Sequence, residues 1–177
     1  MQWTLDTTHT QVGFSVKHMA ISTVRGRFTT FNGTGETNEA GRLVKAAFTI
    51  DTASIDTNQE QRDAHLRSAD FFDAEQFPTL SFESTEIEQD GTDIEITGNF
   101  TMHGVTRPVT LKGETTAVVQ DPWGNTRTAL ALEGKLLRKE WGLTWNSALE
   151  FGGVMVSEDV KLSLELEAVA VGVPAAV

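Results

Sequence analysis

Alternation of apolar and polar residues with a period of two most constrains how this sequence can fold. The cleanest run is Asp93–His103, in which every second residue is apolar or glycine and the others are polar. Because successive side chains of a strand point to opposite faces, such alternation predicts strands with one face in an apolar interior and the other in water. Further runs predict strands at Gln11–Met19, Leu43–Asp51, Thr79–Ile87, Thr106–Val119, Arg127–Arg138 and Asp159–Ala170.

Turn sequences separate these runs at the spacing of hairpins. Asn32-Gly33, His103-Gly104 and Asp121–Asn125 carry residues that favour tight turns. Roughly eight or nine strands result, which favours an all-β fold, either a closed antiparallel barrel or a sandwich. Without an internal repeat or a linker, the chain of 177 residues is predicted to form one domain, residues 1–171, followed by a short frayed tail at 172–177.

One segment departs from the period of two. Thr57–Glu60 has the spacing of a capping box, in which the threonine is the N-cap and the glutamate reaches back to its amide. This predicts a helix over Gln61–Ala69, with Asp63 and Arg67 paired one turn apart. An apolar stretch follows, containing Phe71, Phe72 and Phe77. We therefore expect the segment to pack across one end of the barrel as a plug or lid.

Composition narrows the classes of partner. Lysine and arginine number 14 against 25 aspartates and glutamates, for a net charge of −11, which disfavours nucleic acid and anionic lipid surfaces. The absence of cysteine excludes disulfides, thiolate metal sites and thiol catalysis. The sequence shows no secretion signal and no apolar run near the roughly 18 residues that span a bilayer. We therefore expect a cytoplasmic protein without stable membrane insertion.

The inner face predicted by alternation is almost wholly apolar. In the predicted strand Leu43–Asp51, the alternation places Val44 on this inner face. An eight-stranded barrel is just wide enough either to be filled by side chains or to hold one small ligand, and the pattern leaves both open. A guest in such a lumen would be mostly hydrocarbon, because the lining offers few hydrogen bonds. The other inner residues are Phe14, Val16, Phe28, Phe48, Ile50, Phe82, Ile94, Ile96, Phe100, Met102, Val109, Leu111, Leu130, Leu132, Val160, Leu162 and Leu164.

The four histidines match no metal-binding motif, and no metal site is expected. A hydrogen bond at a strand end is the expected role of His9. His65 on the helix and His103 at a turn are expected to be solvated. His18 shares a strand face with Phe14, so it either pairs with a neighbouring strand or contacts a ligand head group at the barrel mouth.

Arg62, His65 and Arg67 cluster beside the expected lid. They form either a solvated helix face paired with Asp63 and Asp70 or a cationic rim for a phosphate or quinone head.

The sequence lacks a nucleophile elbow, a phosphate-binding glycine loop and a paired-carboxylate signature, so no catalytic residues and no enzyme activity are expected. Trp3, Trp141 and Trp145 lie in strand-rich surroundings and are expected to pack in the core or at a barrel end. Trp123 lies in a polar turn and is expected to be exposed.

Several segments together resemble the YceI-like family over nearly the whole chain. They are Trp3–Asp6, His9–Val12, Phe14–His18, Ala53–Thr57, Arg62–Asp73, Gly98–Val109, Arg138–Gly142 and Val160–Leu162. The resemblance implies an extended, lipocalin-like, eight-stranded antiparallel barrel with a short helical segment near one end. It also implies that the lumen binds polyisoprenoids or related long-chain amphiphiles.

This chain departs from the family at two points. Members are often exported to the periplasm, whereas no signal is visible here. Trp141 stands where the family often has an aspartate–phenylalanine or similar pair. Members often form dimers, so a homodimer is also an expectation.

The leading hypothesis is binding, transport or storage of a long-chain isoprenoid, such as a polyprenyl phosphate or an isoprenoid quinone, without any other cofactor. One alternative is an enzyme acting on such a lipid through His18, His65 or Arg62, and another is a structural or stress-response module with a filled barrel. The residues expected to contact the ligand are Phe14, Val16, His18, Phe28, Phe48, Ile50, Arg62, His65, Phe82, Ile96, Phe100, Met102, Leu111, Leu132, Trp145 and Leu162.

Overall fold

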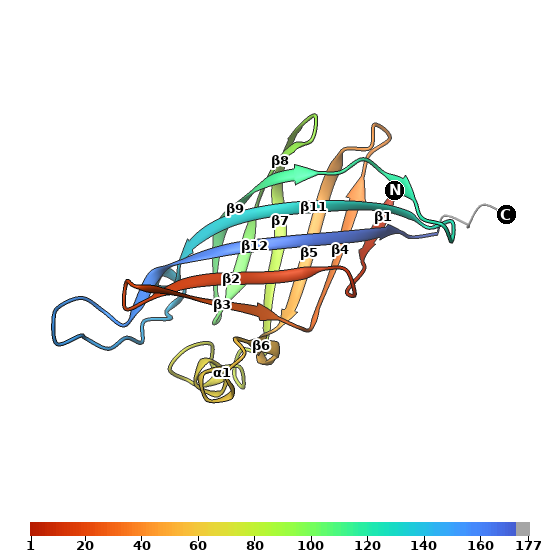
Figure 1. Ribbon diagram of the computed structural model, residues 1–177. Helices are drawn as coiled ribbons and strands as arrows, with labels where there is room; N and C mark the ends of the chain where they lie inside the picture. The colour runs from red at the N-terminus through yellow and green to blue at the C-terminus, as the bar shows by residue number, and fades with distance from the viewer. Residues whose placement is uncertain (173–177) are drawn as a thin grey trace.

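The computed structural model describes residues 1–172 as an antiparallel β-barrel with one α-helix below it (Figure 1). Residues 173–177 of the expected tail lie outside the described residues. Among residues 1–172, no helix has the length and apolar character needed to cross a membrane. The elements are β1 (Gln2–Leu5), β2 (Gln11–His18), β3 (Ser22–Phe28), β4 (Phe31–Thr37), β5 (Leu43–Asp51), η1 (Thr52–Ser54), β6 (Ile55–Asp56), α1 (Glu60–Arg67), β7 (Thr79–Asp90), β8 (Asp93–Met102), β9 (Val105–Thr115), β10 (Val119–Gln120), β11 (Thr126–Leu137), η2 (Arg138–Trp141) and β12 (Val156–Ala170).

The longest strand, β12, closes the barrel. It pairs with β11 along one edge, and along its other edge it pairs first with β2 and then with β1. Since β2 pairs with β3 and β1 pairs with β4, these four short strands fill two positions of the barrel. With β5, β7, β8, β9, β11 and β12 the sheet closes as an eight-stranded antiparallel barrel, which confirms the expected fold.

Every strand predicted from alternation is present, but the expected turn at Asn32-Gly33 is wrong. Both residues lie inside β4, where Gly33 pairs with Phe48 of β5. A Cβ atom at Gly33 would lie 2.5 Å from Leu5 Cδ1 and 2.8 Å from Phe48 Cδ2. Glycine is therefore needed at this position for the close approach of two apolar side chains, not for a turn.

A β-bulge also changes the predicted inner face of β5. Val44 is 49% exposed instead of facing inward. Lys45 pairs with Glu36 while Leu43 pairs with Thr37, so Val44 is the extra residue between two successive pairs. Leu43 then takes the inward position.

The helical segment lies near one end of the barrel, as expected, but its N-terminus is built differently. Gln59, not Thr57, is the N-cap of α1. The backbone amide and hydroxyl of Thr57 instead donate to the buried carboxylate of Asp63, at 2.8 and 2.5 Å. That carboxylate therefore points away from the helix surface, and the predicted ion pair between Asp63 and Arg67 does not form.

Candidate binding lumen

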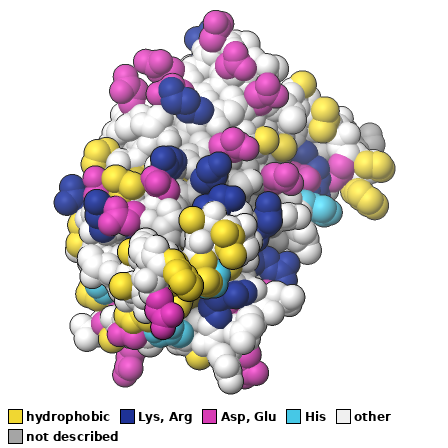
Figure 2. Space-filling model, turned by 60° about the vertical axis from the view of Figure 1, so that its left-hand side comes forward, with side chains coloured by type: hydrophobic (Ala, Val, Ile, Leu, Met, Phe, Trp, Pro, Cys, Tyr) yellow, Lys and Arg dark blue, Asp and Glu magenta, His cyan; other side chains and the backbone are white. Residues whose placement is uncertain are grey.

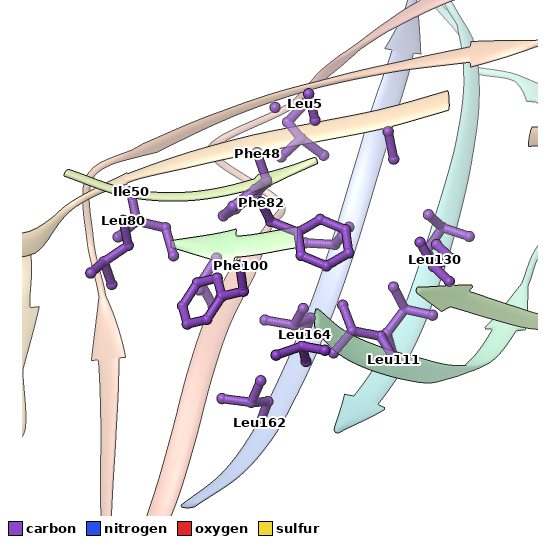
Figure 3. Close-up of a pocket in the computed structure, with 18 of the residues that line it drawn as sticks. Leu5, Phe48, Ile50, Leu80, Phe82, Phe100, Leu111, Leu130, Leu162 and Leu164 are labelled. Atoms are coloured by element: carbon purple, nitrogen blue, oxygen red, sulfur yellow. The ribbon is translucent and has the colours of Figure 1, made fainter. Parts of the chain in front are cut away.

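The barrel encloses an elongated apolar cavity of about 280 Å³. Phe82, Phe100 and Leu164 project into the same space from three different strands (Figure 3). Along β12, alternate residues from Val160 to Leu166 line the cavity, a run of roughly 20 Å at about 3.3 Å per residue. The shape and lining suit an extended hydrocarbon chain better than a compact polar molecule.

Several inward-facing residues at mid-strand are only half-buried. Phe48, Phe82, Phe100, Leu162 and Leu164 belong to this group. In a core packed to the usual density, apolar side chains at such positions would be closed off almost completely. Their exposure is to the lumen, so the barrel is not filled by its own side chains.

Glycine on a neighbouring strand lets one large ring lie along the wall. Gly26 of β3 pairs with Phe14 of β2, and a Cβ atom at Gly26 would lie 2.2 Å from the ring Cζ. Because this Cβ atom is missing, the phenylalanine ring occupies its place against the backbone. The lining is therefore aromatic there.

One end of the barrel is packed tightly. Trp141 of η2 is only 1% exposed, and its indole Nε1 donates to the carbonyl of Phe100 at 3.2 Å. Met102 and Leu143 are also buried there. Trp3 at the opposite end of the barrel is buried as well, so Trp3 and Trp141 are core residues, as predicted.

The expectation of a solvated His103 is wrong. This residue occupies the β8–β9 turn, as predicted, but its ring is half-buried against Phe77, with centroids 4.8 Å apart. Its Nδ1 lies 3.1 Å from the carbonyl oxygen of Trp141. His103 thus connects the turn to η2.

Arg138, at the start of η2, fixes the loop that leads to β12. Its guanidinium donates to the carbonyl oxygens of Leu143, Trp145 and Ser157 at 2.8–2.9 Å and to that of Val156 at 3.3 Å. The residue is 5% exposed, and burial lowers the pKa of its guanidinium. Sequence reasoning missed this role, since the partners are backbone atoms that leave no mark in the sequence.

The structure brings together most of the sixteen residues expected to contact a ligand. Their common property is an apolar side chain on the inner face of a strand. The twelve that line the cavity are Phe14, Val16, Phe28, Phe48, Ile50, Phe82, Ile96, Phe100, Met102, Leu111, Leu132 and Leu162.

His18, Arg62, His65 and Trp145 are not among the residues that line the cavity. The guanidinium of Arg62 donates to the hydroxyl and carbonyl of Thr57, at 2.7 and 2.8 Å, and so braces the segment before α1. His18 ends β2, in register with Val156.

His65 and Trp145 lie behind the lining, around Phe71. The His65 ring meets Phe71 and Trp145 edge-on, with centroids 5.0 and 4.8 Å away, and its Nε2 lies 2.8 Å from Asp70 Oδ2. Phe71 is the member of this cluster that lines the cavity, together with Leu66 and Phe72. Sequence reasoning placed the phenylalanines in a lid but did not identify them as lining residues.

A polar cluster lies at the opposite end of the barrel. Arg127 contacts carboxylate oxygens of Asp6, Asp121 and Glu167 at 2.6–2.7 Å. His9 Nδ1 lies 2.9 Å from Asp6 Oδ2, the strand-end contact expected for it. Asp6, His9 and Glu167 lie close together, but Asp6 Oδ2 and Glu167 Oε1 already accept hydrogen bonds from the guanidinium of Arg127.

These contacts shift the pKa values of the cluster in opposite directions. Hydrogen bonds from Thr8, Arg127 and His9 hold the pKa of Asp6 well below its usual value of 3.8. Arg127 and Asn125 do the same for Asp121. The hydrogen bond to Asp6 raises the pKa of His9 above its usual 6.5.

Comparison with known proteins agrees with this barrel, since residues 3–168 match the YceI-like domain family. The chain belongs to the YceI-like family. It is 37% identical over 162 residues to Protein YceI of Salmonella newport, covering 91% of this chain and 82% of that protein. The crystal structure of the Campylobacter jejuni YceI protein is 32% identical, with a TM-score of 0.76 over 94% of this chain and 96% of that one.

A more distant YceI-like fold is a polyisoprenoid-binding domain from Saccharophagus degradans, implicated in plant cell wall breakdown. It has a TM-score of 0.65 over 95% of this chain and 98% of that one, at 17% identity. At this identity the likeness shows the shared fold.

Proposed function

We propose that this protein binds the hydrocarbon tail of a long-chain isoprenoid or similar amphiphilic lipid in the barrel lumen, for transport or storage. The observation that carries the proposal is the half-burial of the inward phenylalanines and leucines at mid-barrel. Apolar surface left uncovered inside a protein is unfavourable. A hydrocarbon tail would cover it, and each methylene moved from water contributes about 0.8 kcal/mol.

The polar groups of the lining limit the alternatives. Arg138 lines the cavity, but each nitrogen of its guanidinium already donates to a backbone carbonyl. Thr115, Thr116 and Thr128 lie at the end of the lining opposite η2. A sugar or nucleotide placed in mid-lumen would lose its hydrogen bonds to water without replacement. The solved polyisoprenoid-binding domain with the same fold supports the proposed class of ligand.

Native mass spectrometry of freshly purified protein tests the proposal. The expected result is a mass excess of one lipid per chain, which solvent extraction removes and from which an apolar long-chain compound is recovered. Protein extracted in this way should take up a prenyl alcohol again. Folded protein that arrives empty and takes up no prenyl alcohol would refute the proposal.

A further inference from the structure

Two loop tips lie side by side at the end of the barrel that carries η2 (Figure 1, left). The first is the β2–β3 turn, which contains Met19 and Ile21. The second is the long loop between η2 and β12, whose tip is held as a small hairpin by a bridge between Ala148 and Val154. The Met19 amide donates to the carbonyl of Met155 at 2.8 Å, so the β2–β3 turn is joined to the base of the long loop.

Large apolar side chains on these tips are exposed to solvent. Phe151 is 99% exposed and Ile21 is 81% exposed, and Met19 and Val154 are also exposed. Figure 2, which turns this side forward, shows hydrophobic side chains gathered there with lysine and arginine side chains nearby. A single exposed apolar residue is ordinary, whereas a group on two neighbouring loop tips is typical of an interaction site.

Cations on the adjacent barrel wall give the patch its charge. Arg25, Ser15 and Lys161 lie in one row across β3, β2 and β12, and Lys17 stands two residues before the tip at Met19. These three cations are exposed and make no ion pair within residues 1–172. Glu150, in the hairpin between Ala148 and Val154, is the acidic residue on these tips.

Two nearby acids are already compensated. Glu158 is paired with Lys139 and Asp159 with Lys135. Charge repulsion from the distant parts of the chain is screened beyond about 8–10 Å at ordinary ionic strength, so the local cations dominate at contact. The net charge of −11 therefore does not exclude docking at this particular end.

We propose that these tips dock on the surface of a membrane containing anionic lipids. Phe151 and Ile21 enter the boundary between head groups and acyl chains, and Lys17, Arg25 and Lys161 face the lipid phosphates. The lining of the lumen reaches the base of both tips at Val16 and Val156, so docking would bring the cavity close to the bilayer. The proposal goes beyond lumen binding and does not depend on it.

Co-sedimentation with vesicles tests the docking. The wild-type chain is expected to sediment with vesicles of phosphatidylcholine and phosphatidylglycerol. The double variant Ile21→Ser/Phe151→Ser is expected to bind at least about tenfold more weakly, since two apolar side chains no longer leave water. Trp123→Ser is the matched control, because Trp123 is 78% exposed at the opposite end, and it should bind as the wild type does.

The cations are tested separately. Lys17→Gln/Lys161→Gln should weaken binding to vesicles with phosphatidylglycerol and leave binding to phosphatidylcholine alone unchanged. The control is Lys112→Gln, which removes a cation paired with Glu95 away from the tips and should have no effect.

Three results would overturn the proposal: no sedimentation of the wild type, an equal loss in Trp123→Ser, or a wild-type dimer that Ile21→Ser/Phe151→Ser dissociates in light scattering. The last result would assign the patch to a second copy of this chain. Uptake of a prenyl alcohol by the same variants should match the wild type, so a failure of docking is distinguishable from a failure of lumen binding.

Discussion

The mid-barrel lumen and the end closed by η2 are lined by the same kinds of residue, yet they differ in packing. Phe48, Phe82 and Leu162 at mid-barrel are half-buried, whereas Met102 and Trp141 at the closed end are almost fully buried. The strands alternate in the same way in both regions. The difference comes from what covers the inward faces: η2 and its loop fill the closed end, and no segment of residues 1–172 fills the middle.

The comparison therefore separates two roles of apolar burial. At the closed end it supplies stability, because side chains meet side chains. At mid-barrel Leu111 and Leu132 are buried as well, but Phe82 and Leu162 are left partly uncovered, and under the proposed function a ligand covers them.

The largest expected effect is on stability at the closed end. Trp141→Ala should lower the free energy of unfolding by about 3–5 kcal/mol, because it leaves a large cavity and removes the bond to Phe100. Leu162→Ala at mid-barrel should cost about 1 kcal/mol or less, since its side chain faces open space. Urea denaturation of both variants measures the difference, and equal losses would contradict the contrast.

Arg138 and Arg127, at opposite ends of the barrel, should also differ in their contribution to stability. Arg138→Met should lower the free energy of unfolding by about 2–4 kcal/mol, because buried carbonyls of Leu143 and Trp145 lose their hydrogen-bond donor. Arg127→Met should lower the free energy of unfolding less than Arg138→Met does, since Asp6 and Asp121 keep hydrogen bonds from the backbone amides of Thr8 and Asn125. Urea denaturation midpoints at neutral pH rank the stabilities of the two variants, and a lower midpoint for Arg127→Met than for Arg138→Met would contradict this ranking.

Ligand affinity should show the opposite pattern. Phe82→Ala should weaken uptake of a prenyl alcohol roughly 10–100-fold, which corresponds to about 1.5–3 kcal/mol for one covered phenylalanine. Its unfolding free energy without ligand should change less than that of Trp141→Ala. Ser81→Ala, on the other face of β7, is the control. Fluorescence titration compares the affinities of the wild type, Phe82→Ala and Ser81→Ala for the prenyl alcohol. An unchanged affinity in Phe82→Ala would show that this ring is not part of the binding surface.

The smallest effect concerns pH and the polar cluster. The lowered pKa of Asp6 means that its contacts stabilise the fold above its usual pKa of 3.8 and that this contribution fades as pH falls below it. The raised pKa of His9 works in the other direction: its contribution is present below pH 6.5 and is lost as pH rises through the folded value. An NMR titration of both side chains checks the signs. Ordinary pKa values for both would contradict the contacts of the cluster.

Much of the barrel could be predicted because apolar and polar residues alternate regularly along long strands such as β8 and β12, which identifies their inner face. Short or irregular strands could not be predicted in this way. In β4, glycines stand where inward side chains would be expected, and in β5 the bulge at Val44 shifts the alternation by one residue.

The lining was predictable for the same reason, since twelve of its residues lie on alternating faces. The polar candidates were harder, because their contacts join distant positions or use backbone atoms. Arg127 gathers Asp6, Asp121 and Glu167 from three separate parts of the chain. Arg62 and Arg138 bond to carbonyls, which every residue possesses.

Calorimetric titration of a prenyl alcohol into a matched pair of variants tests the open lumen most directly. Leu164→Trp places a large ring in the middle of the cavity, whereas Ser163→Trp places it on the exposed outer face of the same strand. With an open lumen, the wild type and Ser163→Trp bind one molecule per chain, and folded Leu164→Trp binds none. Equal binding by both tryptophan variants would contradict the open lumen.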